Sequence, residues 1–490
     1  MRNVGTTYSR GVLRRLAYLT LFFLCLLPQT VNAFDKFSID VEKIDTKDWQ
    51  LNDVSLTLLN IDQRTQQLVL SIKQLTLPEP FTDIRFFDVQ CLSFSWQDNE
   101  ILCDKGKAGI KSSRFISSPF DFSFAITDKQ SHFNIKNLKF SQGILSLNAK
   151  VEGDTWSLKL KSKDILLQHL KPLLPEKLLD DISSGSVDAD IKASGNHSGL
   201  DHLVIKTQFK KVSLQAKQGK LAAESLNLAL DLVAKHKQGS WQWENNSHIQ
   251  QGELYIDPVY MDIKGQGITL NTKGLWHKQG VIELQQVKLT QPDVVDLTAQ
   301  GLINTKTEAP IETANISADI EDLDVFTQQY VMPFMEQTGL EGIHLKGLLT
   351  AQINIAKSAI EQVFVKLKKL DVSDDKNRLA IEQAKGGLNW SNTEAESKPS
   401  YIHWDKLKVK VIPIEAGELK FLLLNKRITL LEKSHIPLLG GVLDINQFDW
   451  HKDTTDEPAV YFSGAIHDLS LEQLSAALEW TPLSGNISGS

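Results

Sequence analysis

The chain has 490 residues, of which 41% are hydrophobic and 23% charged, so it can bury a sizeable apolar surface and is not an intrinsically disordered chain. Its 60 acidic residues outnumber its 53 lysines and arginines and give a formal net charge of −7. This balance excludes a nucleic-acid-binding protein, because phosphates require clustered basic residues. It also excludes a protein held on anionic lipid mainly by its own charge.

The first 33 residues have the three parts of a secretory export signal. Arg14 and Arg15 form the positive end, residues 16–27 form an apolar run, and Val31-Asn32-Ala33 is a small-residue cleavage site. The apolar run is shorter than the roughly 20 residues that span a bilayer comfortably. We therefore expect residues 1–33 to be a cleaved signal peptide, with an uncleaved signal anchor as the alternative.

Two cysteines, Cys91 and Cys103, follow the export signal and flank a predicted hairpin. Residues 92–102 between them are interpreted as a strand, a polar turn at 97–99 and a second strand. This hairpin would bring the two thiols opposite each other across the ladder, where an oxidising compartment would join them in a disulfide. Two buried free thiols are the alternative. The region offers too few further ligands for a zinc site.

Alternation of apolar and polar residues is the main pattern from about residue 38 to the end of the chain. It is clearest at 145–151, 187–191 and 351–355, where every second residue is apolar. Such runs predict strands with one apolar and one wet face. Helical periodicity appears in only a few short places, so the predicted fold is mostly β and not an alternating β-α fold.

Those few helical places mark an internal repeat. Short apolar-periodic segments at 160–170, 320–330 and 466–474 each lead into a strand that begins near a glycine. The segments that follow also correspond in order, 212–214 with 370–372, 221–224 with 379–382, and 252–254 with 417–419. We therefore divide the chain into an N-terminal β region with the cysteine hairpin (34–155), a first unit (156–315), a second unit (316–460) and the start of a truncated third unit (461–490).

The repeat resembles the AsmA-like superfamily of envelope proteins, and within it the YdbH-type branch. The resemblance is carried by residues 467–489, by residues 436–450 with a looser counterpart at 252–263, and by the cysteine hairpin at 91–103. It covers most of residues 35–490. These motifs mark strands and turns, so no catalytic residue is carried over. The chain departs from the family pattern at its C-terminus, since family members look longer.

The resemblance implies an elongated, curled antiparallel sheet that forms a groove with an apolar interior. Such proteins look like conduits that carry phospholipid or other acyl-chain lipids between the inner and outer membranes of Gram-negative bacteria. It therefore implies a periplasmic location, a lipid partner, attachment to the inner membrane if the signal is uncleaved, and envelope proteins as further partners. The alternating apolar residues are the candidate groove lining: Leu145, Leu147, Val187, Ala189, Ile191, Ala351, Ile353 and Ile355. The alternative is that they pack into an ordinary closed core.

Other residue patterns predict no chemistry. His435, His451 and His467 lack metal-ligand spacing and are interpreted as surface or turn histidines. Gly440-Gly441 is interpreted as a turn, because no helix opening with a lysine follows it. The acidic clusters at 374–375 and 453–457 are interpreted as solvated turns rather than calcium sites. No nucleophile and base stand in a recognisable context.

We therefore expect no enzyme, metal or cofactor. Two classes of function remain. The first is a conduit or transfer protein for lipids. The second is a structural or assembly scaffold of the envelope that binds proteins through its sheet edges and carries no lipid.

Overall fold

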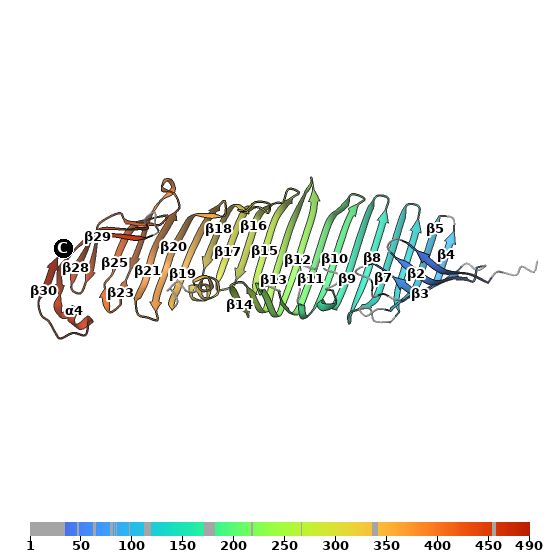
Figure 1. The fold of residues 1–490 in the computed structure, drawn as a ribbon, viewed down its shortest axis with the longest axis horizontal. Helices are drawn as coiled ribbons and strands as arrows, with labels where there is room; N and C mark the ends of the chain where they lie inside the picture. The colour runs from blue at the N-terminus through green and yellow to red at the C-terminus, as the bar shows by residue number, and fades with distance from the viewer. Residues whose placement is uncertain are drawn as a thin grey trace, which may run out of the picture.

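The computed structural model describes residues 35–490. It leaves out short segments at 47–48, 62–64, 79–81, 83, 85, 98, 112–118, 171–181, 217–218, 266, 336–341 and 453–456. The predicted export signal and most of the acidic cluster at 453–457 lie outside the described residues. The described chain forms one 30-stranded sheet that runs along the whole length of the molecule (Figure 1). The predicted mostly β, elongated antiparallel fold is therefore confirmed.

The N-terminal part of the sheet is a meander in which each strand pairs with the next one along the chain. Its strands are β1 (Lys36–Asp45), β2 (Gln50–Leu59), β3 (Gln66–Thr76), β4 (Phe86–Gln97), β5 (Glu100–Lys111), β6 (Phe120–Thr127), β7 (Gln130–Phe140), β8 (Gly143–Glu152) and β9 (Thr155–Leu166).

The central part contains the longest strands. It consists of the short helix η1 (Leu167–His169) and of β10 (Ile182–Asn196), β11 (Gly199–Gln215), β12 (Leu221–Lys237), β13 (Ser240–Ile256), β14 (Val259–Ile263), β15 (Ile268–His277), β16 (Val281–Gln291), β17 (Val295–Asn304) and β18 (Ile311–Ile320). On the side away from β12, the long β13 pairs with two strands. One half of it forms a short hairpin with β14, and the other half pairs with β15, which continues the sheet.

The C-terminal part begins with a helical connection of α2 (Leu323–Phe326), η3 (Thr327–Val331) and α3 (Met332–Met335), followed by β19 (Ile343–Ala356), β20 (Ala359–Asp374) and β21 (Leu379–Ser391). Beyond β21, most strands are short, and only β28 and β29 are about as long as β21. The remaining elements are η4 (Glu394–Glu396), β22 (Pro399–Trp404), β23 (Lys406–Val409), β24 (Ile412–Ile414), β25 (Gly417–Leu424), β26 (Arg427–Leu430), β27 (Ser434–Leu438), β28 (Gly441–Lys452), β29 (Pro458–Ser470), α4 (Leu471–Ala477) and β30 (Asn486–Gly489).

Short strands lie end to end in this C-terminal part, and the sheet nevertheless stays continuous. β22 and β23 pair with different halves of β21, and the long β28 then pairs with both β26 and β27. Trp404 lies at the junction of β22 and β23, where its indole N–H donates to the carbonyl of Glu415 at 2.9 Å. The turn between β27 and β28 contains Gly440 with a φ of 75°, as predicted for the glycine pair.

Three helical connections lie on the same long edge of the sheet, the lower edge in Figure 1. They join β9 to β10, β18 to β19, and β29 to β30, at the three places where the sequence predicts helical periodicity. Two of them begin with a polar cap: the Asp322 carboxylate accepts from the backbone N–H groups of Asp324 and Val325, and the Ser470 hydroxyl accepts from that of Gln473. The predicted unit limits at 315 and 460 fall inside β18 and β29, so the ladder runs through them without a break.

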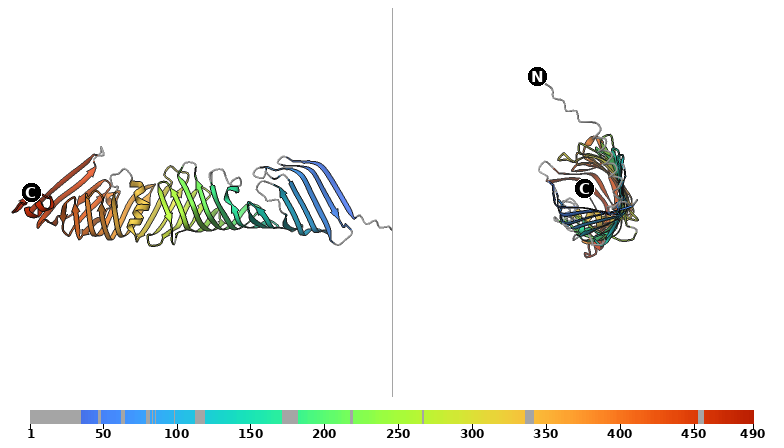
Figure 2. Two further views of the ribbon diagram at one scale, coloured as in Figure 1. Left: turned by 90° about the horizontal axis from the view of Figure 1, so that it is seen from below. Right: turned by 90° about the vertical axis from the view of Figure 1, so that its right-hand side faces the viewer.

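Irregular pairings bend many strands near this lower edge. The ladder shifts between Phe209 and Val212 in β11, between Glu224 and Asn227 in β12, and between Leu367 and Leu370 in β20. An extra residue in one strand bends it and increases its twist. The end-on view shows the consequence, a sheet curled into an arc along its length (right panel of Figure 2).

Candidate functional site

One face of the sheet carries an apolar residue at the same height on almost every strand. Directly paired residues of neighbouring strands point to the same face, so the pairing register defines this row. Only Asn245 and Thr272 are polar in it, and Gly106 has no side chain. We call it the apolar row; from β1 to β29 it consists of Phe37, Leu58, Leu68, Cys91, Gly106, Phe122, Ile135, Leu147, Leu160, Ile191, Ile205, Leu232, Asn245, Thr272, Val287, Ala299, Ile316, Ile353, Val363, Trp390, Leu423, Ile428, Trp450 and Val460.

From β8 to β19 the opposite face is polar. On these strands, the residue next to each member of the apolar row belongs to a polar row. It consists of Ser146, Lys161, Asp190, Lys206, Asp231, Asn246, Asn271, Lys288, Thr298, Ser317 and Gln352. Ion pairs cross from strand to strand in this row, such as Lys161 to Asp190 at 3.5 Å and Lys206 to Asp231 at 3.8 Å. The sheet therefore has one face suited to water and one suited to hydrocarbon.

The eight predicted lining residues all lie on the apolar face. Leu147, Ile191 and Ile353 belong to the apolar row itself. The other five lie on the same strands, two or four residues away from row members and therefore on the same face: Leu145, Val187, Ala189, Ala351 and Ile355. The structure thus places on one face of the sheet residues that lie up to two repeat units apart in the sequence. That they line a groove for a ligand stays a prediction.

Burial on the apolar face increases toward the lower edge. There Ile165, Val187 and Val212 are buried and belong to the largest apolar cluster, whereas Leu147 and Ile353 in the apolar row are only half-buried. The buried clusters and the helical connection between β18 and β19 pack on the apolar face, and we therefore take it as the inner face of the arc. The lower side of the inner face is packed, and its middle is partly open to solvent.

The connection between β18 and β19 covers part of the inner face. Leu323 of α2 packs with Val295 and Ile320, and Phe326 and Tyr330 join this cluster. The Tyr330 hydroxyl donates to the side-chain oxygen of Gln291 on β16 at 2.7 Å, and burial raises the pKa of Tyr330. This helical connection therefore covers the inner face at the lower ends of β16 to β18.

Cys91 and Cys103 form the predicted disulfide, with Cα atoms 5.9 Å apart and both side chains fully buried. The two residues are not direct partners in the ladder, however: Cys91 pairs with Gly106, and Cys103 pairs with Phe94. The prediction that the two cysteines lie directly opposite each other in the ladder was therefore wrong. Pairing is irregular beside both cysteines, and this brings them diagonally together on the inner face. A disulfide of this kind indicates an oxidising, extracytoplasmic compartment.

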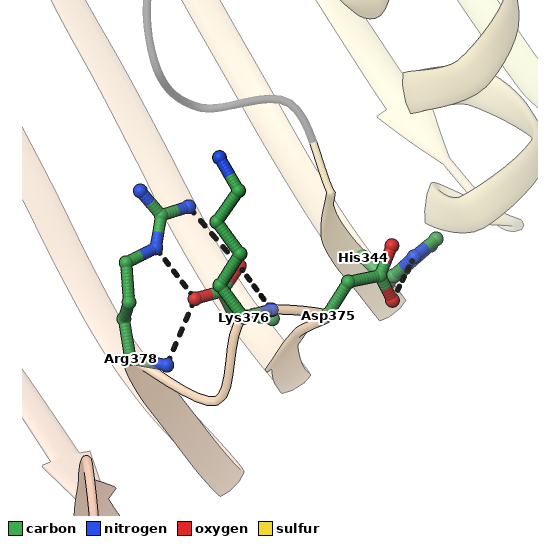
Figure 3. Close-up of polar contacts among 5 residues, drawn as sticks. His344, Asp375, Lys376 and Arg378 are labelled. Atoms are coloured by element: carbon green, nitrogen blue, oxygen red, sulfur yellow. Dashed lines mark hydrogen bonds and ion pairs between the residues drawn. The ribbon is translucent and has the colours of Figure 1, made fainter.

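The acidic pair at 374–375 forms an ordered turn between β20 and β21 (Figure 3). The Asp374 carboxylate accepts from the Nε and Nη2 atoms of Arg378 at 2.6 and 3.0 Å and from the Arg378 backbone N–H at 2.9 Å. These hydrogen bonds, first of all that of the guanidinium, hold the pKa of Asp374 far below its ordinary value. Asp375 points the other way and contacts His344 at 3.1 Å. Asp374 is thus part of a structural ion pair and not a solvated turn residue.

The three histidines near the C-terminus lie on strands, not in turns, which corrects one part of their interpretation. Their partners are aspartates of β28. His435 and His467 both contact Asp444, at 2.5 and 3.2 Å, and the hydrogen bond of His435 is the main cause that lowers the pKa of this carboxyl. His451 contacts Asp449 at 2.8 Å.

Asp449 is buried, which by itself would raise its pKa. The hydrogen bonds of Arg427, at 2.6 and 2.8 Å, outweigh this effect together with those of His451 and Thr429, so the pKa of Asp449 is lowered. Within the described part of the chain, no group of three or more His, Cys, Asp or Glu residues could hold a metal ion.

No protein-family model matches the chain, and no curated protein matches it significantly. Among the residues that the structure describes, no helix is both long and apolar enough to cross a membrane. The observations that bear on function are therefore the continuous antiparallel sheet, its apolar inner face and its buried disulfide.

Proposed function

We propose that this chain is a periplasmic envelope protein that shields and conducts phospholipid or other acyl chains along its apolar row, as a member of the AsmA-like superfamily and its YdbH-type branch. The observation that carries the proposal is the apolar row itself, which runs from β1 to β29 with two polar interruptions and lies opposite a polar row.

The energetics of acyl chains support this function. Each methylene group in water costs about 0.8 kcal/mol relative to an apolar environment. An apolar row along a continuous sheet removes this penalty while a headgroup remains in water. At a strand spacing of about 4.8 Å, the rows from β1 to β29 extend over about 100 Å, a length comparable with the gap between two membranes.

The partial exposure of the inner face also fits a lipid occupant. In a closed core, residues such as Leu147, Ile191 and Ile353 would be packed against a second layer, whereas here they are half-buried. Apolar side chains arranged in a continuous and incompletely covered row mark a binding surface rather than a finished core.

Site-specific photo-crosslinking tests the proposal. A photoreactive phenylalanine analogue at Ile353 on the inner face should crosslink to phospholipid in cells, and one at Gln352, the next residue on the same strand, should not. Ile191 and Lys192 on β10 give a second matched pair. Equal labelling of the two faces, or no lipid on either, would refute the conduit. A protein-binding envelope scaffold without lipid cargo would then be the better explanation.

Attachment to the inner membrane is a separate part of the proposal. Residues 1–33 would provide it only if they remain on the protein. Fractionation of cells followed by N-terminal sequencing of the protein distinguishes an uncleaved anchor from a periplasmic chain that begins after Ala33.

A further inference from the structure

A hollow of about 360 Å³ opens at the upper edge of the sheet, between the ends of β12, β13, β15, β16 and β17. Its walls include two tryptophans, two histidines and two lysines: His236, Trp241, Trp276, His277, Lys278 and Lys306. We call it the rim hollow. It lies at the edge opposite the three helical connections through η1, α2 and α4, which do not cover the inner face there.

The tryptophans place the rim hollow on the inner face. Trp241 pairs with Trp276 across the ladder, and Trp241 lies four residues before Asn245 of the apolar row on β13, so its ring points to the same face. Between them, Trp243 lies against Gly274, where an added Cβ atom would come within 3.0 Å of the Trp243 ring. A band of indole rings therefore runs from the rim hollow toward the apolar row, which it meets at the polar pair Asn245 and Thr272.

Trp276 remains 56% exposed, although it is one of the largest apolar side chains of the chain. Indole rings prefer boundaries where one side is apolar and the other is wet. An exposed tryptophan at the open edge of an apolar face is the arrangement expected where the polar end of an amphiphile leaves a groove.

The charges around the hollow favour an anion. Lys278 and Lys306 both line it, no carboxylate does, and neither lysine forms an ion pair with another described residue. His277 is engaged by the Ser240 hydroxyl at 2.9 Å and lies 3.9 Å from Glu283. Two unpaired ammonium groups in a chain of net charge −7 therefore stand beside an apolar entry.

We propose that the rim hollow binds the phosphate group of an anionic lipid, with Lys278 and Lys306 pairing with the phosphate and Trp241 and Trp276 packing against the upper part of the acyl chains. The tail then continues past Trp243 to the apolar row members that flank Asn245 and Thr272, Leu232 on β12 and Val287 on β16. This inference rests on the proposed lipid function and adds to it a headgroup class and a defined position along the sheet.

Titration calorimetry with soluble probes tests the proposal. Dihexanoylphosphatidylglycerol, kept below its micelle concentration, should bind the wild-type protein, and the double variant Lys278→Gln/Lys306→Gln should bind it about tenfold more weakly. The matched control is Lys273→Gln/Lys288→Gln on the opposite face of β15 and β16, which should bind as the wild type does. Equal binding by the two double variants would overturn the proposal.

Two further arms identify the ligand and the place. Inorganic phosphate alone should bind far more weakly than the lipid, and if it binds equally well, the hollow is an anion site without lipid specificity and the proposal fails. The change in tryptophan fluorescence on lipid binding should be reduced in Trp276→Phe; an undiminished change places the lipid elsewhere and also overturns the proposal.

The test of the rim hollow and the test of the conduit can fail independently of each other. If the lysine variants bind the lipid normally while Ile353 still crosslinks to phospholipid, only the rim hollow is refuted. If Ile353 and Gln352 label alike, the conduit is refuted whatever the lysines do.

Discussion

A carboxylate placed in the apolar row should block lipid movement without unfolding the protein. Ile353 lies in the middle of β19, paired with Ile316 on one side and Val363 on the other, and it is half-buried. Roughly four methylene groups span one strand spacing of about 4.8 Å. A hydrated carboxylate at this position would keep about that number out of apolar contact, at about 0.8 kcal/mol each.

The variant Ile353→Glu should therefore raise the barrier to transfer by about 3 kcal/mol, which corresponds to a rate lower by about a hundredfold. Transfer of a fluorescent phospholipid between donor and acceptor vesicles measures this rate. Gln352→Glu on the polar face is the matched control and should change the rate less than twofold. A normal rate in a folded Ile353→Glu protein would refute the row as the path of the lipid. Circular dichroism establishes folding, and Ile353→Asn offers an uncharged substitute if the glutamate variant does not fold.

Three further predictions concern stability. Reduction of the disulfide, whose cysteines lie 12 residues apart, should lower the free energy of unfolding by about 3 kcal/mol in denaturant titrations, and no change would contradict its stabilising role. Asp374→Asn should be less stable than the wild type above about pH 4. Because the pKa of Asp374 is lowered in the native state, this difference in stability should shrink as the pH falls below that value. Acid titrations followed by circular dichroism measure it, and a pH-independent difference would contradict the prediction. Within β12, Leu226→Ala at the bend should cost about 3 kcal/mol and Leu232→Ala in the apolar row about 1, and equal losses in urea titrations would contradict the difference in burial.

The strands and their faces could be predicted from the sequence because alternation is a local property. The runs at 145–151, 187–191 and 351–355 form β8, β10 and β19, and their apolar residues share the inner face. The connections through η1, α2 and α4 were predictable for the same reason, since a short change of period marks each of them. The disulfide followed from two cysteines that flank a hairpin.

The sequence could not predict the pairing register of the strands, that is, which residues of neighbouring strands lie opposite each other. Leu147, Ile191 and Ile353 share one row because of the turns and bulges that lie between them, and single bulges leave no clear pattern in one sequence. The same limit explains why the shared contact of His435 and His467 with Asp444 was missed, since three different strands contribute to it. The error in the register of the two cysteines has another cause: Gln97, predicted as a turn residue, belongs to β4 and pairs with Glu100, which moves the register of the whole hairpin.

The rim hollow was missed because its residues come from separate hairpins, although part of its pattern is local. Trp241 and Trp243 alternate with polar residues in phase with the inner face of β13. That alternation was a usable signal for two aromatic rings on the apolar side. Their meeting with Trp276 and Lys306 depended on the pairing of β13 with β15 and of β16 with β17, which only the structure provides.

Stability and binding draw on different parts of the same face. The bend holds buried side chains, including Ile165, Val187 and Leu226, together with the helices that pack along the lower edge. Burial there stabilises the fold without a ligand. The apolar row and the rim hollow above it stay partly uncovered, so their apolar surface is removed from water only when an apolar ligand lies on it. A sheet divided in this way can release and accept a hydrophobic occupant while remaining folded, because the contacts that change are not those that hold the strands in their curve.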